Sequence, residues 1–182
     1  MKKVAIFLAE GFEESEAVII IDVLRRASIN IDIISVTGNE MVTGAHNIVL
    51  KAEKLFSNQN YEQYDMLVLP GGASGVFNLI CDDKLLELLL NFHKNGKYLA
   101  AICAAPQILG KIGVAQNKII SVYPGCYNYL KEAKISQQPI SVDENLVTAP
   151  SLGTAIPFAL EIVKILLGTK KQKAIAKQLV II

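Results

Sequence analysis

The stretch "YLAAICAAPQIL", residues 98–109, decides the fold because an extended run ends in it and a helical run begins. Residues 98–102 form a short apolar run, which is typical of a strand buried on both faces of a parallel sheet. After Cys103 come small residues and then Pro106, which suits the first turn of a helix because that turn needs no N–H. The pattern therefore predicts a strand that ends at a cysteine, with a helix starting directly behind it.

The rest of the chain repeats this alternation of strand-length and helix-length segments. The expected strands span residues 2–8, 31–36, 65–70, 98–102 and 144–150, and the expected helices span residues 14–28, 83–94, 152–167 and 169–181. Turn signals in 37–52 predict a small hairpin attached to the sheet. The alternation predicts an α/β fold, a three-layer α/β/α sandwich with a mostly parallel sheet, in a single domain covering residues 1–182.

The amino-acid composition indicates the general class of protein and the partners that are not expected. The chain is 52% hydrophobic and 19% charged, with a net charge of +1, which is typical of a compact soluble protein. We expect no nucleic-acid partner and no membrane partner, because no strongly basic or acidic balance is present and no apolar run reaches the ~18 residues of a membrane span. The apolar stretch near the N-terminus is short and runs into acidic residues, so it predicts a first strand rather than a signal peptide.

Three cysteines, Cys81, Cys103 and Cys126, are present. Their number is odd, and they lack CxxC spacing and any Cys/His spacing typical of a metal site. We therefore expect reduced thiols, a cytoplasmic location and no bound metal.

Cys103 is the first candidate for a catalytic residue. Ligands of open parallel sheets bind outside the carboxyl ends of the strands, and Cys103 is expected at such an end. Free backbone N–H groups and a helix N-terminus there favour a thiolate. The alanines around it, including Ala104, permit the tight strand-to-helix turn of a nucleophile elbow. The alternative, a buried and inert cysteine, stays open on position alone.

Two other stretches should reach the same edge of the sheet. In "VLPGGASG", residues 68–75, Gly71 and Gly72 could turn their N–H groups toward an anion, although an ordinary glycine turn explains them equally well. In "LAEGFEESEA", residues 8–17, a first helical turn carries three glutamates. Such acids complement the helix dipole, so only a carboxylate that points at the sheet edge would need another explanation.

With these stretches together, the chain resembles the ThiJ/PfpI superfamily, and within it a branch of small dimeric proteins. The resemblance rests on "FLAEGFEESEAVIIIDVLRRA", "YDMLVLPGG", "LAAICAAPQIL" and "TAPSLGTAIPFALEIV". It implies a flavodoxin-like fold, a homodimer and no cofactor. It also implies a reactive Cys103 with a partly buried Glu16 hydrogen-bonded to its sulfur, and an anion site lined by the N–H groups of Gly72 and Ala104.

The activities that the resemblance implies act on small reactive carbonyl compounds. They are a cofactor-free glyoxalase activity on 2-oxoaldehydes and the removal of methylglyoxal adducts from amines. A thiolate would attack the aldehyde carbon, and Glu16 would shuttle the proton. The alternative is a non-enzymatic redox-responsive stress protein or holdase, in which Cys103 oxidises to a sulfinate.

The sequence departs from the family pattern at positions that could line the site. Tyr123 takes the place of a histidine near the cysteine, and His46 takes the place of an arginine near the pocket. Cys126 could resolve an oxidised Cys103. Arg26 is a further residue that could line the site.

Activation of the Cys103 thiol requires a large fall in its pKa. An ordinary cysteine is only about 3% ionised at pH 7, so a mostly ionised Cys103 requires its pKa to fall by roughly 2–3 units. Glu16 can help only when it is protonated, because an ionised carboxylate would repel the thiolate. Burial raises the pKa of a carboxyl group, so a neutral Glu16 is expected.

Overall fold

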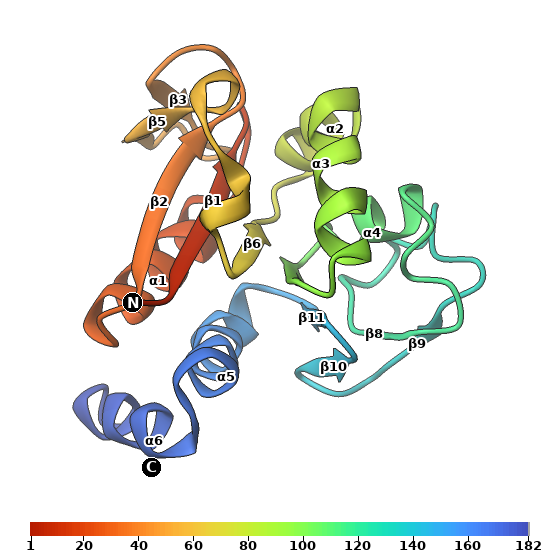
Figure 1. The fold of residues 1–182 in the computed structure, drawn as a ribbon. Helices are drawn as coiled ribbons and strands as arrows, with labels where there is room; N and C mark the ends of the chain where they lie inside the picture. Colours follow the sequence, from red (N-terminus) through yellow and green to blue (C-terminus); the bar gives the residue numbers. More distant parts are fainter. Residues whose placement is uncertain (182) are drawn as a thin grey trace.

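The structure, a computed structural model, describes residues 1–181 and has three layers, with helices on both faces of a central sheet (Figure 1). The sheet has seven strands in the order β10-β11-β7-β6-β1-β2-β5, and every neighbouring pair is parallel except β10 with β11. These strands are β1 (Lys3–Leu8), β2 (Asn30–Ser35), β5 (Lys54–Leu55), β6 (Met66–Leu69), β7 (Tyr98–Ile102), β10 (Ser141–Asp143) and β11 (Leu146–Ala149).

Two groups of helices bury the two faces of the sheet. The α-helices are α1 (Glu14–Arg26), α2 (Ala73–Ile80), α3 (Asp83–Lys94), α4 (Pro106–Lys111), α5 (Ala155–Leu167) and α6 (Thr169–Gln178). α1 and α5 pack side by side on one face, with α6 against α5, while α2, α3 and α4 cover the other. Each face has its own apolar cluster, so the central strands are buried on both sides, as their unbroken apolar sequences predict.

The predicted fold class is confirmed, and the differences are local. The helix at 83–94 has the predicted bounds, and the last two predicted helices begin or end within three residues of the observed ones. The hairpin is present as β3 (Met41–Thr43) and β4 (Val49–Lys51), but it forms a two-stranded sheet of its own. The short α2 and a second small sheet, β8 (Ile119–Ile120) with β9 (Lys134–Ile135), were not predicted.

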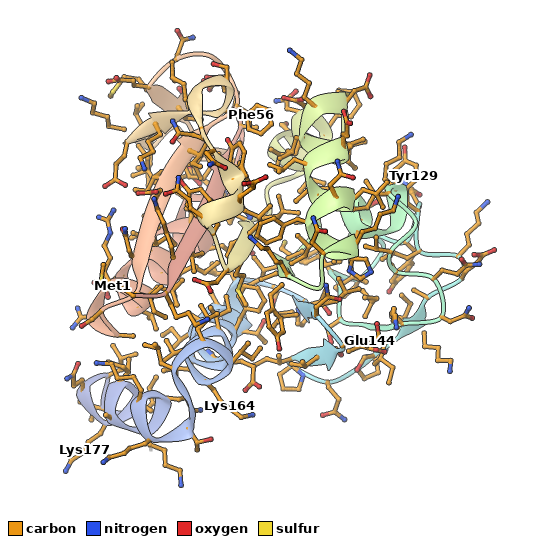
Figure 2. The ribbon with its side chains drawn as sticks, in the orientation of Figure 1. Met1, Phe56, Tyr129, Glu144, Lys164 and Lys177 are labelled. Atoms are coloured by element: carbon orange, nitrogen blue, oxygen red, sulfur yellow. The ribbon has the colours of Figure 1, made fainter. Side chains whose placement is uncertain are left out.

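Short 3-10 helices complete the connections, at η1 (Phe56–Asn58), η2 (Tyr61–Gln63) and η3 (Leu152–Thr154). At the end of the chain, α6 is amphipathic: Ile175 is buried, whereas Lys177 is exposed and points away from the body of the protein (Figure 2). Within residues 1–181, no helix combines the length and the apolar character that crossing a membrane requires.

The order of the strands brings the three predicted site segments together. β7, β6 and β1 are consecutive neighbours and run in the same direction, so their carboxyl ends lie at one edge of the sheet. Cys103 follows β7, Gly71 and Gly72 follow β6, and the loop into α1 follows β1. Residues that are almost ninety positions apart in the chain thus meet at this edge, where open parallel sheets bind ligands.

Candidate active site

Cys103 occupies a tight turn between β7 and α4. Its backbone has φ of +64°, a left-handed conformation that a residue with a side chain rarely adopts. Two backbone hydrogen bonds hold it: the Cys103 N–H donates to the carbonyl of Ala149 at 2.9 Å, and its own carbonyl accepts from the N–H of Tyr123 at 2.9 Å. Such a backbone costs roughly 1–3 kcal/mol and persists only where the surroundings enforce it. The structure therefore contains the tight strand-to-helix turn that the sequence predicts at Cys103.

Glu16 points from the first turn of α1 into the sheet edge. Its side chain is fully buried, with 0% exposed. The N–H of Gly71 donates to Glu16 Oε2 at 2.8 Å, and the Cys103 thiol is a second hydrogen-bonding partner of the carboxyl group. Among residues 1–181, Glu16 Oε1 has no hydrogen-bond partner. One oxygen of the carboxyl group is therefore fixed by a backbone N–H, and the other is buried without a hydrogen-bond partner in the part of the chain that the structure describes.

The two positions after β6 must be glycine because neighbouring atoms lie too close to leave room for a side chain. A Cβ atom on Gly71 would lie 2.6 Å from the Cβ of Cys103 and 2.6 Å from Glu16 Oε2. Gly72 has φ of +93°, and a Cβ atom there would collide with the carbonyl oxygen of Gly11. Only glycine at both positions lets the β6 loop touch the cysteine, the glutamate and the loop after β1 together.

The N–H groups around the sulfur differ in part from the expectation. Those of Gly72 and Ala104 donate toward Cys103 and lower the pKa of its thiol. The N–H of Gly71 was expected to join them, but it is used by Glu16 instead. The structure therefore offers two backbone donors, rather than three, to an anion at the sulfur.

Burial changes the expected protonation of this pair. It raises the pKa of Glu16 to about 7, against the opposing effect of the hydrogen bonds from Gly71 and Cys103. Burial, together with the nearby Glu16 carboxylate, also raises the pKa of Cys103 to about 12, which outweighs the N–H groups of Ala104 and Gly72. The expectation of a lowered cysteine pKa is therefore wrong. The pair loses its first proton at about pH 7. Both burial and the neighbouring carboxylate disfavour a thiolate at Cys103.

Four further residues were expected near the site, and two of them lie beside the cysteine loop. Tyr123 reaches Cys103 through its backbone N–H, while its side chain is 48% exposed. Cys126 follows in the same loop and donates its N–H to the carbonyl of Tyr123 at 3.0 Å. Its thiol is half-buried, and that burial raises its pKa.

The other two lie elsewhere. His46, in the turn between β3 and β4, places Nδ1 3.0 Å from Glu14 Oε2 rather than at Cys103. Arg26 is ion-paired with Asp22 at 2.6 Å near the end of α1. It is ten residues from Glu16 along the helix, a rise of about 15 Å. Within one chain, the structure does not bring Arg26 to the sulfur.

One residue that the sequence did not single out is buried beside this site. Glu14 is only 2% exposed, and its carboxylate lies under the hairpin turn at Gly44. The sequence pattern shows acids in a first helical turn, which the helix dipole explains for all of them equally. No signal in the chain distinguishes the buried Glu14 from its neighbour Glu13.

The raised pKa of Glu16 predicts a pH-dependent stability. The folded protein binds this proton more tightly than the unfolded chain, so the contribution of Glu16 is fully present below about pH 4.3 and declines as the pH rises through about 7. Glu16→Gln cannot ionise. The unfolding free energy of this variant relative to wild type should therefore rise between pH 5 and pH 8, by up to roughly 3 kcal/mol.

Urea unfolding of both proteins across this range measures the difference. Glu87→Gln, which alters an exposed carboxylate on α3, is the matched control and should show no such trend. If the difference in unfolding free energy between wild type and Glu16→Gln stays constant from pH 5 to pH 8, the pKa of Glu16 is not raised in the folded state.

The chain is also similar in sequence and in fold to known proteins. Residues 2–165 match the model of the DJ-1/PfpI family. Protein dj-1beta of Drosophila melanogaster is 34% identical over 183 residues, covering 99% of this chain and 97% of that protein. Its crystal structure superimposes with a TM-score of 0.95 at 33% identity, covering 100% of this chain and 98% of the other.

Two further relatives carry informative names. A Schizosaccharomyces pombe protein named glutathione-independent glyoxalase DJ-1 is 29% identical, covering 98% of each chain. A structure of Toxoplasma gondii DJ-1, described as oxidized, is 34% identical with a TM-score of 0.93, covering 99% of this chain and 98% of the other. From the family match over residues 2–165 and these relatives of nearly equal length, the chain is a member of the DJ-1/PfpI family.

Proposed function

We propose that this protein is a cofactor-free enzyme of the glyoxalase type, acting on small 2-oxoaldehydes or their adducts through Cys103 and Glu16. The observation that carries the proposal is the carboxyl group of Glu16. It is fully buried, its pKa is raised to about 7, and one of its oxygens is unpartnered beside a cysteine held in a strained turn. A pKa near the working pH is the property that a group needs to accept and return a proton within one catalytic cycle. The name of the Schizosaccharomyces pombe relative supports this activity.

The first step would use Glu16 as a base. As the sulfur of Cys103 bonds to the aldehyde carbon, the thiol proton passes to Glu16, so no free thiolate is needed beforehand. The carbonyl oxygen gains negative charge and accepts the N–H groups of Gly72 and Ala104, which already point at the sulfur. Protonation of that oxygen completes a hemithioacetal and leaves Glu16 ready to accept a proton again.

The later steps would move one more proton. Removal of the hydrogen on the sulfur-bearing carbon gives an enediol, and return of a proton to the neighbouring carbon gives the thioester of a 2-hydroxy acid. Water then releases the acid and restores the thiol. Methylglyoxal becomes lactate with no oxidant or reductant, because the aldehyde carbon is oxidised while the ketone carbon is reduced. Glu16 Oε1, which has no partner among residues 1–181, is the atom available for these transfers.

A second candidate function rests on the same N–H groups. Gly72 and Ala104 could hold the oxygens of an oxidised Cys103, and the structure of the Toxoplasma gondii relative is described as oxidized. In this reading the protein responds to peroxide, as a redox-responsive stress protein or holdase, rather than turning over a carbonyl compound. The three free thiols support a reducing compartment such as the cytoplasm for either function.

Turnover distinguishes the two functions. Lactate formed from methylglyoxal should be abolished in Cys103→Ser and reduced at least ~100-fold in Glu16→Gln, because general acid–base catalysis contributes on that order. Tyr123→Phe should retain most of the activity, since the contact of Tyr123 with Cys103 is made by its backbone N–H and not by its hydroxyl group.

Lactate must be measured directly, because loss of methylglyoxal alone also reports simple thiol addition. Wild-type protein that forms no lactate, while peroxide converts Cys103 to a sulfinate ahead of Cys81 and Cys126, would favour the redox function. A Tyr123→Phe defect as large as that of Glu16→Gln would overturn the roles assigned to these residues.

We also propose that the protein is a homodimer. The outer surface of α1 and the β3–β4 hairpin expose a group of large apolar side chains, namely Val18 (45%), Met41 (55%), Ile48 (55%) and Val49 (46%). Val18 lies in the run "AVIII", which is more apolar than a solvent-facing helix requires. A second copy packed on this surface would bury these side chains.

Sedimentation equilibrium should therefore show a dimer at micromolar concentration. Val18→Glu should shift the population toward the monomer, because it would place a charge in an apolar interface. The exposed Phe77→Glu on α2, on the other face of the sheet, is the matched control. A monomeric wild-type protein would rule out this proposal.

A further inference from the structure

The hairpin turn between β3 and β4 encloses a carboxylate at the start of α1. Gly44 lies so close to Glu14 that a Cβ atom on the glycine would collide with the carboxyl group. Glu14 Oε1 accepts the N–H of His46 at 2.6 Å and the N–H of Ile48 at 3.3 Å. Glu14 is thus held in one orientation by two backbone donors, although neither of them belongs to its own helix.

This arrangement leaves the second oxygen of Glu14 directed at His46, whose ring nitrogen also approaches Glu13. Glu14 Oε2 lies 3.0 Å from Nδ1 of His46, and Nδ1 lies 3.7 Å from Oε2 of Glu13. The three ligand atoms all lie within 4.8 Å of one another. Bonds of ~2.0–2.2 Å to one ion place its ligand atoms about 3–3.5 Å apart, so only a small closure would bring the three onto one ion.

The charges around this cluster favour a positive charge between the side chains. Two carboxylates converge there, and within residues 1–181 His46 is the one basic side chain paired with either of them. The side chain of Glu14 is 3% exposed, so its charge is poorly solvated, whereas that of His46 is 68% exposed and faces water. A proton on His46 or a metal ion in its place can supply the positive charge.

We propose that Glu13, Glu14 and His46 form a binding site for a divalent transition-metal ion such as Zn²⁺. An imidazole nitrogen with two carboxylate oxygens suits these ions, whereas Mg²⁺ and Ca²⁺ prefer sites made of oxygen alone. The backbone N–H groups on Glu14 Oε1 are the outer-shell support that orients a metal ligand. The site is separate from the sulfur of Cys103, and it would fasten the hairpin to α1.

The site is also connected to the loop that orients Glu16. The N–H of Glu13 donates to the carbonyl of Gly71 at 2.9 Å, and the N–H of Gly71 donates to Glu16. An ion on Glu13 would therefore restrain the segment that carries the carboxyl group of the candidate active site. The metal site does not depend on the proposed catalytic activity, because its test measures binding alone.

Calorimetric titration of the metal-free full-length protein with Zn²⁺ tests the proposal. One ion should bind per chain, and His46→Gln should weaken binding at least tenfold, since even outer-shell changes weaken metal sites by about 10–100-fold. His93→Gln, which removes the one other histidine of the chain, is the matched control and should bind as wild type does. Mg²⁺ should not compete. Because His46 is exposed, its replacement should leave the fold intact, which circular dichroism checks.

Co²⁺ as a spectroscopic probe identifies the ligands. The expected spectrum has weak visible bands and no intense sulfur-to-metal charge-transfer band, and it should persist in Cys103→Ser. An intense charge-transfer band, or binding lost in Cys103→Ser and kept in His46→Gln, would assign the ion to a thiol and overturn the proposal. Absence of Zn²⁺ binding to the wild type, or equal losses in His46→Gln and His93→Gln, would also overturn it.

Discussion

The hydrogen bond from the N–H of Gly71 to Glu16 is the interaction on which the rest of the site depends. It turns a carboxyl group from the first turn of α1 into the buried edge of the sheet, where its pKa rises to about 7. It also requires glycine at position 71, because a side chain there would strike both Glu16 and Cys103. The carboxyl group, the thiol and the β6 loop therefore pack directly against one another, and each of them limits the positions that the other two can adopt.

The contact between Glu16 and Cys103 influences the protonation state of the cysteine. Backbone donors favour a thiolate at Cys103, but burial and the nearby carboxylate oppose it more strongly. In the proposed mechanism the thiol is not inert, because Glu16 would accept its proton at the moment of attack. Reactivity would then arise from a shared proton rather than from an isolated thiolate, and it would require both residues of the pair.

The sequence predicts the framework of this site well because the framework depends on local patterns. Buried parallel strands are continuous apolar runs, and their ends locate the carboxyl edge at Cys103 and at Gly71. The short α2 escaped prediction because "ASGVFNLI" directly follows a glycine turn and contains a glycine itself. The position of the hairpin in a separate sheet depends on tertiary packing, which a turn signal does not describe.

Side-chain environments were harder to predict for the same reason. Glu14 and Glu16 differ by two positions, a rotation of about 200° around a helix, so they face opposite directions. One is enclosed by the hairpin and has its pKa lowered, because hydrogen bonds from His46 and from backbone N–H groups outweigh the effect of burial. The other reaches the sheet edge and has its pKa raised. The chain shows two similar acids, and only the fold assigns them different chemistry.

The shared proton is tested most directly by the pH dependence of iodoacetamide labelling at Cys103, read by mass spectrometry in wild type and in Glu16→Gln. The wild-type labelling rate should rise with a midpoint near pH 7, because the pair loses its first proton at about that pH. In Glu16→Gln the midpoint should move upward by at least ~1 pH unit, since the base is lost while the thiol stays buried. A midpoint that moves downward in Glu16→Gln would show that Glu16 merely repels the thiolate, and it would contradict the shared proton.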